Sequence, residues 1–130
     1  MTETTISSLA LLVHDYDEAI DYFTNRLGFT LLEDTALGDH KRWVRVAPPG
    51  GGCALLLARA ADDEQRSAVG KQGGGRVFLF MQSSNFWESY RSMKEAGVNF
   101  LEEPREEPYG CVCVFADLYG NRWDLLGAAG

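Results

Sequence analysis

The chain has 130 residues, of which 45% are hydrophobic and 24% charged, and its formal net charge is −7. This length suits one soluble globular domain with a real core. The acidic balance argues against nucleic-acid binding, which needs a basic face; it is compatible with a cationic ligand or with a solvated acidic surface. Neither a basic N-terminal region nor a long apolar run indicates a signal peptide or a membrane span. The odd number of cysteines, three, argues against a disulfide scaffold and favours a reducing cytoplasm.

The N-terminal half predicts strands at 6–13, 29–33, 42–47 and 53–58, with one helix after the first of them. Asp15 is placed to cap that helix, with Glu18 three residues later as in a capping box. The helix is expected to end at Gly28, where a left-handed C-cap favours a residue without a Cβ. The order is therefore βαβββ. Residues 61–75 are polar and end in glycines, so we interpret them as a linker in which Asp62 caps a short helical turn.

The C-terminal half predicts the same order again. Strands are expected at 76–82, 98–102, 111–115 and 121–126, with a helix that Asn85 starts and Gly97 ends, and a rigid proline-flanked loop at 104–110. When Gly97 is aligned with Gly28, Leu101 falls on Leu32 and Glu102 on Glu33. Two copies of one unit predict modules at about 5–60 and 76–127 within a single domain.

Three segments carry a resemblance to a known family. The first is Val13-His-Asp-Tyr-Asp-Glu-Ala-Ile-Asp-Tyr-Phe-Thr-Asn-Arg-Leu-Gly-Phe, the second is Pro108-Tyr-Gly before a strand, and the third is Asp117-Leu-Tyr-Gly-Asn-Arg-Trp-Asp-Leu. In these motifs the chain resembles the vicinal oxygen chelate superfamily of glyoxalases, bleomycin-resistance proteins and extradiol dioxygenases. The resemblance implies an α+β fold of two βαβββ modules that form a cup-shaped open barrel. It also implies a homodimer.

Metal-using members of the superfamily bind one divalent cation through His and Glu side chains of the inner strands. The resemblance carries these positions onto Ser8, the neighbourhood of Leu56, Arg76 (or Val77) and Asp124. One carboxylate does not make a transition-metal site, so we expect no metal cofactor. His14 and His40 are expected in surface loops, and Cys111 and Cys113 as small buried residues on one face of a strand.

The same mapping gives candidate ligand-binding and catalytic groups. If Arg76 and Asp124 both point into the cup, a guanidinium takes the place of the metal, and the pair either supports the fold or binds an oxyanion or carbonyl. The alternative is that Arg76 only begins its strand and reaches to water. Asp124 is the one candidate general base, and Ser8 a candidate ligand contact.

Aromatic residues lie on or beside the expected cup strands, and small-molecule pockets use aromatic walls with a few polar groups. Trp43, Phe78 and Tyr109 are the candidate ligand contacts, and core packing is the alternative for each. Strand alternation excludes that Trp123 and Asp124 both line one face.

We therefore expect a metal-independent, dimeric protein that binds a small molecule and resembles the bleomycin-resistance type. The alternative is an enzyme, a glyoxalase-like lyase or isomerase or a dioxygenase, that uses Asp124 as base or recruits a metal. A third possibility is a module that docks another protein through a sheet edge or helix face.

Overall fold

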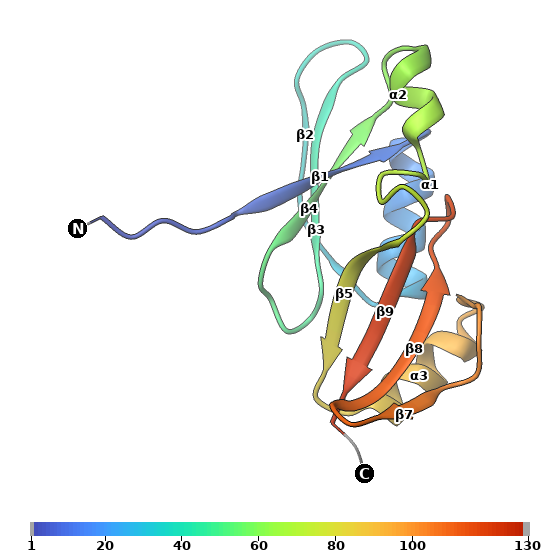
Figure 1. Cartoon of the computed structure of the whole chain (residues 1–130). Helices are drawn as coiled ribbons and strands as arrows, with labels where there is room; N and C mark the ends of the chain where they lie inside the picture. The colour runs from blue at the N-terminus through green and yellow to red at the C-terminus, as the bar shows by residue number, and fades with distance from the viewer. Residues whose placement is uncertain (1, 129–130) are drawn as a thin grey trace. The chain divides into compact units, whose positions relative to one another are not determined.

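The computed structural model describes residues 2–128, and its contacts divide the chain into two compact units that meet between Ala68 and Val69. The first unit contains β1 (Ser8–Val13), α1 (Tyr16–Asp21), the π-helical turn η1 (Tyr22–Arg26), β2 (Thr30–Ala36), β3 (Arg42–Ala47), β4 (Ala54–Arg59) and α2 (Asp63–Ala68). The second contains β5 (Val77–Ser83), α3 (Phe86–Glu95), β6 (Asn99–Phe100), β7 (Arg105–Glu107), β8 (Gly110–Ala116) and β9 (Arg122–Gly127). In Figure 1 the strands of the first unit are coloured blue to green and those of the second unit yellow to red.

The two sheets share one topology. In the first unit the strand order is β1-β4-β3-β2, and in the second it is β5-β9-β8-β6, with β7 paired to β8. In each sheet the first strand runs parallel to the last, while the other neighbours are antiparallel. The predicted α+β class and the repeated βαβββ order are confirmed.

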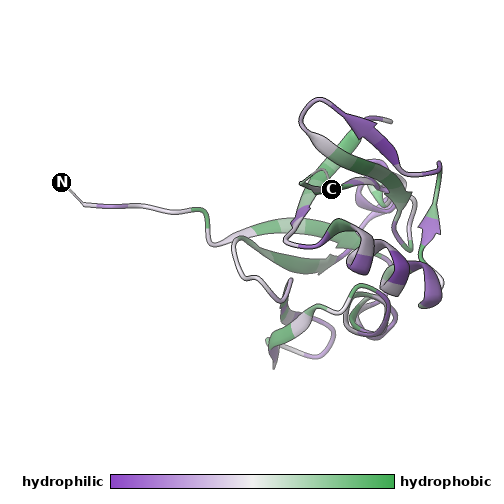
Figure 2. Cartoon of the chain, turned by 90° about the horizontal axis from the view of Figure 1, so that it is seen from below, coloured by the Kyte–Doolittle hydropathy of each residue, from purple (hydrophilic) through white to green (hydrophobic). Residues whose placement is uncertain are grey.

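Each sheet is buried on the side that its helix covers. In the first unit, Val44 and Val46 of β3 and Ala19 of α1 are fully buried. In the second, α3 lies against β9 and contributes Phe86 and Tyr90 to the core (Figure 1). Figure 2 shows hydrophobic residues in green along the central strands, and hydrophilic residues in purple on the helical coils, on loops and on some of the outer strands. Within residues 2–128, no helix is long and apolar enough to cross a lipid bilayer.

Local signals in the sequence predicted the helix ends correctly. Asp15 accepts a hydrogen bond from the Glu18 backbone N–H at 2.8 Å, and Asn85 accepts one from Glu88 at 3.2 Å. Gly28 and Gly97 both have positive φ, 71° and 90°. The predicted strand at 42–47 coincides with β3.

Three segments differ from the prediction. The first helix becomes π-helical after Asp21, because the Thr24 hydroxyl bonds the Ile20 carbonyl and Leu27 N–H bonds back to the Tyr22 carbonyl. The predicted proline-flanked loop contains β7 between its prolines. The predicted strand at 98–102 is reduced to the two residues of β6.

The segment predicted as a linker contains α2, which starts where the Gln65 backbone N–H bonds the Asp62 carboxylate at 2.8 Å. That the two units act as modules of a single domain remains a prediction.

Candidate functional site

The first unit presents a polar and aromatic surface on the sheet side opposite α1. Strand alternation places Val44 and Val46 of β3 in the core, so Trp43 and Arg45 lie on the other side. The Trp43 side chain remains 39% exposed. Leu56 of β4 stands beside Arg45 in the register, and it is half-buried. We call this surface the Arg45 face.

Arg45 is held in place by side chains from two other strands. Its Nη1 donates to the Glu33 carboxylate of β2 at 2.6 Å, and its Nε donates to the Ser8 hydroxyl of β1 at 3.0 Å. The side chain is only 20% exposed, so the ion pair is better shielded than a typical surface pair. These two hydrogen bonds hold the planar guanidinium group in one orientation on the sheet surface.

Sequence reasoning missed Arg45. The alternation of β3 already placed it on the same side as Trp43, but nothing local identified its partners. Glu33 reaches it because β2 has an irregularity between Leu31 and Glu33 that shifts the register against β3.

The residues carried over from the metal-binding relatives do not fit a divalent cation. The Ser8 hydroxyl accepts a hydrogen bond from the Arg45 guanidinium, so this oxygen is engaged by a positively charged group. Leu56 supplies no donor, and Asp124 is the one carboxylate of the set. Within residues 2–128 no group of three or more His, Cys, Asp or Glu side chains is arranged to hold a metal ion.

The second unit also leaves one side of its sheet without a helix. Asp124 lies in the middle of β9, between Phe80 of β5 and Val114 of β8 in the register. Trp123 points to the α3 side, is buried, and donates from its indole N–H to Asp117 at 3.0 Å. The exclusion derived from strand alternation is thus confirmed. We call this second surface the Asp124 face.

Asp124 is an unusual group for a sheet surface. Its Oδ1 atom is buried and has no hydrogen-bond partner among the described residues. Burial raises the pKa of this carboxyl, and the Arg105 guanidinium partly opposes that effect.

Arg105 belongs to a network at the edge of the same face. It donates to Glu102 at 2.9 Å and to Glu107 at 2.5 Å. Glu102 in turn accepts a hydrogen bond from the Val114 backbone N–H at 2.9 Å, beside Asp124. The hydrogen bond to Glu102 contributes most to raising the pKa of Arg105 above its ordinary value.

The remaining predicted residues of the second unit are not gathered around Asp124. Arg76 lies before β5 with an exposed side chain, and the ion pairs found in residues 2–128 do not join it to Asp124. Phe78 is half-buried near Gly73, and Tyr109 is 67% exposed in the turn between β7 and β8. A ligand role for these three residues remains a prediction.

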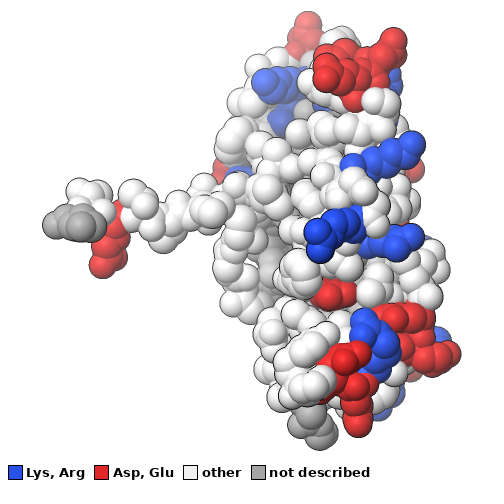
Figure 3. Space-filling view, in the orientation of Figure 1, with Lys and Arg blue, Asp and Glu red and all other residues white. Residues whose placement is uncertain are grey.

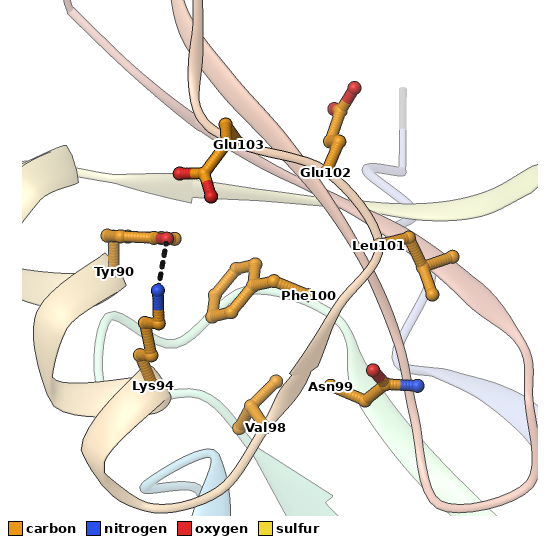
Figure 4. Close-up of a pocket in the computed structure, with 8 residues that line it drawn as sticks. All are labelled: Tyr90, Lys94, Val98, Asn99, Phe100, Leu101, Glu102 and Glu103. Atoms are coloured by element: carbon orange, nitrogen blue, oxygen red, sulfur yellow. Dashed lines mark hydrogen bonds between the residues drawn. The ribbon is translucent and has the colours of Figure 1, made fainter.

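A shallow cleft of about 480 Å³ lies elsewhere on the second unit, between α3 and the segment around β6. Figure 4 shows Lys94 and Tyr90 of α3 facing each other, with Phe100 beside them and Glu103 above. The Lys94 ammonium donates to the Tyr90 hydroxyl at 3.3 Å, and this bond raises the pKa of Lys94. Since the Lys94 and Tyr90 polar groups of this cleft are paired with each other, we treat the two sheet faces as separate candidate sites, one in each unit.

Comparisons with known proteins agree with the fold. Residues 5–125 match the model of the glyoxalase/bleomycin resistance protein/dioxygenase superfamily. An uncharacterized protein of Shewanella frigidimarina (strain NCIMB 400) is 53% identical over 124 residues, which cover 94% of this chain and 92% of that protein.

Two solved structures show the same architecture. UcmS2 is 28% identical with a TM-score of 0.83, and the match covers 96% of this chain and 98% of UcmS2. TnmS3, an antibiotic binding protein from Streptomyces sp. CB03234, is 26% identical with a TM-score of 0.80 over 99% of both chains. The chain belongs to the glyoxalase/bleomycin resistance protein/dioxygenase superfamily.

Proposed function

We propose that the chain binds a small molecule without a metal ion and holds it rather than transforms it. The kinship with TnmS3, an antibiotic binding protein, supports this function, because the match covers nearly the whole of both chains. A fold alone does not determine function, so the proposal depends on the chemistry of the sheet faces.

The observation that carries the proposal is the fixed guanidinium of Arg45 beside the exposed indole of Trp43. Glu33 and Ser8 engage Nη1 and Nε, and among the described residues no acceptor is found for Nη2. The free N–H groups can donate to a carbonyl or carboxylate oxygen of a ligand. The indole offers a flat apolar surface for the ligand's ring.

Binding of anthracene-9-carboxylate, a fluorescent planar anion, tests the Arg45 face. We expect saturable binding. Arg45→Gln should weaken it about tenfold or more, since a hydrogen bond to a charged group contributes about 1.5–3 kcal/mol. Trp43→Ala should weaken it to a similar extent, because it removes the flat apolar surface on which the ring of the probe packs. Trp87→Ala is the matched control, because this second indole on α3 has nearly the same exposure, 37%. Circular dichroism melts check that the variants remain folded.

The proposal fails if the wild-type chain does not bind the probe, or if Trp43→Ala and Trp87→Ala bind it equally. In the second case the probe recognises exposed aromatic side chains in general.

The enzyme alternative keeps one supporting observation, the buried Oδ1 of Asp124 and the raised pKa of its carboxyl. Such a group suits a general base for a glyoxalase-like lyase or isomerase. We expect no turnover of the hemithioacetal that glutathione forms with a 2-oxoaldehyde; turnover that Asp124→Asn abolishes would put the enzyme first. Homodimer formation and a cytoplasmic location remain predictions.

A further inference from the structure

The Asp124 face combines an exposed aromatic ring with an unpartnered carboxylate oxygen. Phe80 is 66% exposed although it stands beside the central strand β9, directly next to Asp124 in the parallel register. Side chains at such paired positions lie on the same side of a sheet, about 5 Å apart. A ligand that packs on the Phe80 ring therefore lies within reach of the Asp124 carboxylate.

Among residues 2–128, no side chain or backbone group forms a hydrogen bond with the Asp124 carboxylate that would compete with a ligand. Its Oδ1 is buried without a hydrogen bond among the described residues. Arg105 of β7 lies on the same side of the sheet by register, but its guanidinium is engaged by Glu102 and Glu107. The second oxygen, Oδ2, is not buried, so a ligand donor can reach the carboxylate there, and a hydrogen bond to this charged group is a source of binding free energy.

The charges around this position favour a cationic donor. Glu102, Glu107 and Asp124 supply three carboxylates, and the two guanidinium groups are Arg105 and the exposed Arg122, two residues earlier on β9. Phe80 and Gln82 of β5 and Val112 and Val114 of β8 carry no charge. Figure 3 shows acidic and basic side chains gathered over the region where Figure 1 places β7 and β8.

We propose that Asp124 and Phe80 form a subsite for the protonated amine of an aromatic ligand, with the ammonium donating to Asp124 Oδ2, the carboxylate oxygen that is not buried, and the ring packing on Phe80. The ring of Phe80 also attracts a cation placed over its face. This subsite rests on the proposed binding function and adds a ligand class to it: an aromatic amine.

The probe for this subsite is 9-aminoacridine, a fluorescent planar cation at neutral pH whose size matches that of anthracene-9-carboxylate. We expect the wild-type chain to bind it saturably, with Asp124→Asn weakening the affinity about tenfold or more. Phe80→Ala, a change of an exposed side chain, is expected to weaken it about fivefold. Nuclear Overhauser contacts between the probe and the Phe80 ring give a readout that does not depend on the variants.

Glu106→Gln is the matched control. Glu106 lies on β7 in the same unit and is exposed, but it pairs with Cys111 in the register and so belongs to the opposite side of the sheet. Its substitution removes the same charge from the same unit and is expected to leave the affinity for 9-aminoacridine within twofold of the wild-type value.

The two probes together distinguish a failure of the amine subsite from a failure of the proposed binding function. Suppose that anthracene-9-carboxylate binds through Trp43 and Arg45, while Asp124→Asn and Phe80→Ala leave the affinity for 9-aminoacridine unchanged. The proposed amine subsite is then wrong, and the proposed binding function stands. If the chain binds neither probe, both proposals fail. If Glu106→Gln weakens 9-aminoacridine as much as Asp124→Asn does, net charge rather than a built subsite attracts the cation, and the subsite is again wrong.

Discussion

Among the described glycines of the second unit, Gly70 is the one where an added Cβ would come closest to a neighbouring atom. Its φ is +78°, and a Cβ built on it would lie 1.9 Å from the carbonyl oxygen of Tyr119. Tyr119 is held in turn by Asp117, which accepts its backbone N–H at 3.0 Å and also bonds Asn121 and Trp123. The turn that carries Tyr119 therefore cannot move away from a new methyl group without disturbing a buried network.

We predict that Gly70→Ala lowers the free energy of unfolding by about 2–4 kcal/mol, from the positive φ and the overpacking together. Gly74→Ala is the control, because Gly74 has a similar φ of +65° and nothing within 4 Å of the added Cβ. It should lose about 1 kcal/mol. Urea unfolding measures both; equal losses would show that the close approach to Tyr119 contributes nothing.

Single residues also show what the sequence could predict and what it could not. The caps at Asp15 and Asn85 and the glycines Gly28 and Gly97 depend on neighbours a few residues away, so their roles followed from the sequence. The partners of Arg45 depend on the cross-strand register and on an irregularity in β2, which have no local signature. The orphaned oxygen of Asp124 likewise depends on strands far apart in the chain.

At the scale of elements, Arg42 joins α1 to the strand pair β2–β3. It forms two hydrogen bonds to Asp34 of β2, at 3.0 and 2.7 Å, and one to Asp17 of α1 at 2.9 Å. Its guanidinium carbon also lies 5.1 Å from the centre of the Tyr16 ring. The paired side chains are partly exposed, so solvent screening limits what these ion pairs contribute.

We predict that Arg42→Gln destabilises the folded chain by about 1 kcal/mol at neutral pH. The hydrogen bond from Arg42 lowers the pKa of Asp34 below its ordinary value of 3.8. A lowered folded-state pKa gives stability that is present above the unfolded-state pKa and is lost as the pH falls through the folded-state value. The difference between wild type and variant should therefore shrink in urea melts below about pH 4.

The control for this element is Arg66→Gln, which removes the exposed pair with Asp63 within α2. We expect no measurable change from it at any pH. If Arg42→Gln also left the free energy of unfolding unchanged, the ion pairs would contribute nothing, and apolar packing alone would hold α1 against the strands.

At the scale of the whole molecule, the repeated unit was the most predictable feature. The second helix, its C-cap glycine and the following strand repeat the first set, and both units adopt the order in which the first strand pairs in parallel with the last. The strand β7 was not predicted, because the prolines on either side of it suggested a loop. A proline lacks the N–H that a strand donates to its neighbour, but just outside the ends of a short edge strand no such hydrogen bond is required.

A further prediction for the whole molecule concerns divalent metal ions. An ion that binds only the folded chain raises the free energy of unfolding by about 2.7 kcal/mol when its concentration is 100 times its dissociation constant, and the melting temperature rises by several degrees. Because the Ser8 hydroxyl is engaged by a guanidinium, and the part of the chain that the structure describes holds no group of three or more His, Cys, Asp or Glu arranged for a metal, we expect no such shift with Ni²⁺, Zn²⁺, Mn²⁺ or Fe²⁺.

Thermal melts of the metal-free chain at increasing concentrations of each ion, with Fe²⁺ kept anaerobic, measure this directly. The exposed thiol of Cys53 can bind soft metals by itself, so Cys53→Ser is the background in which the melts are compared. A shift that saturates at one ion per chain in this background, and that Asp124→Asn removes, would mean that the Asp124 carboxylate takes part in binding the ion. The chain would then be a metal-dependent enzyme candidate, and the expectation that it binds its ligand without a metal ion would be wrong.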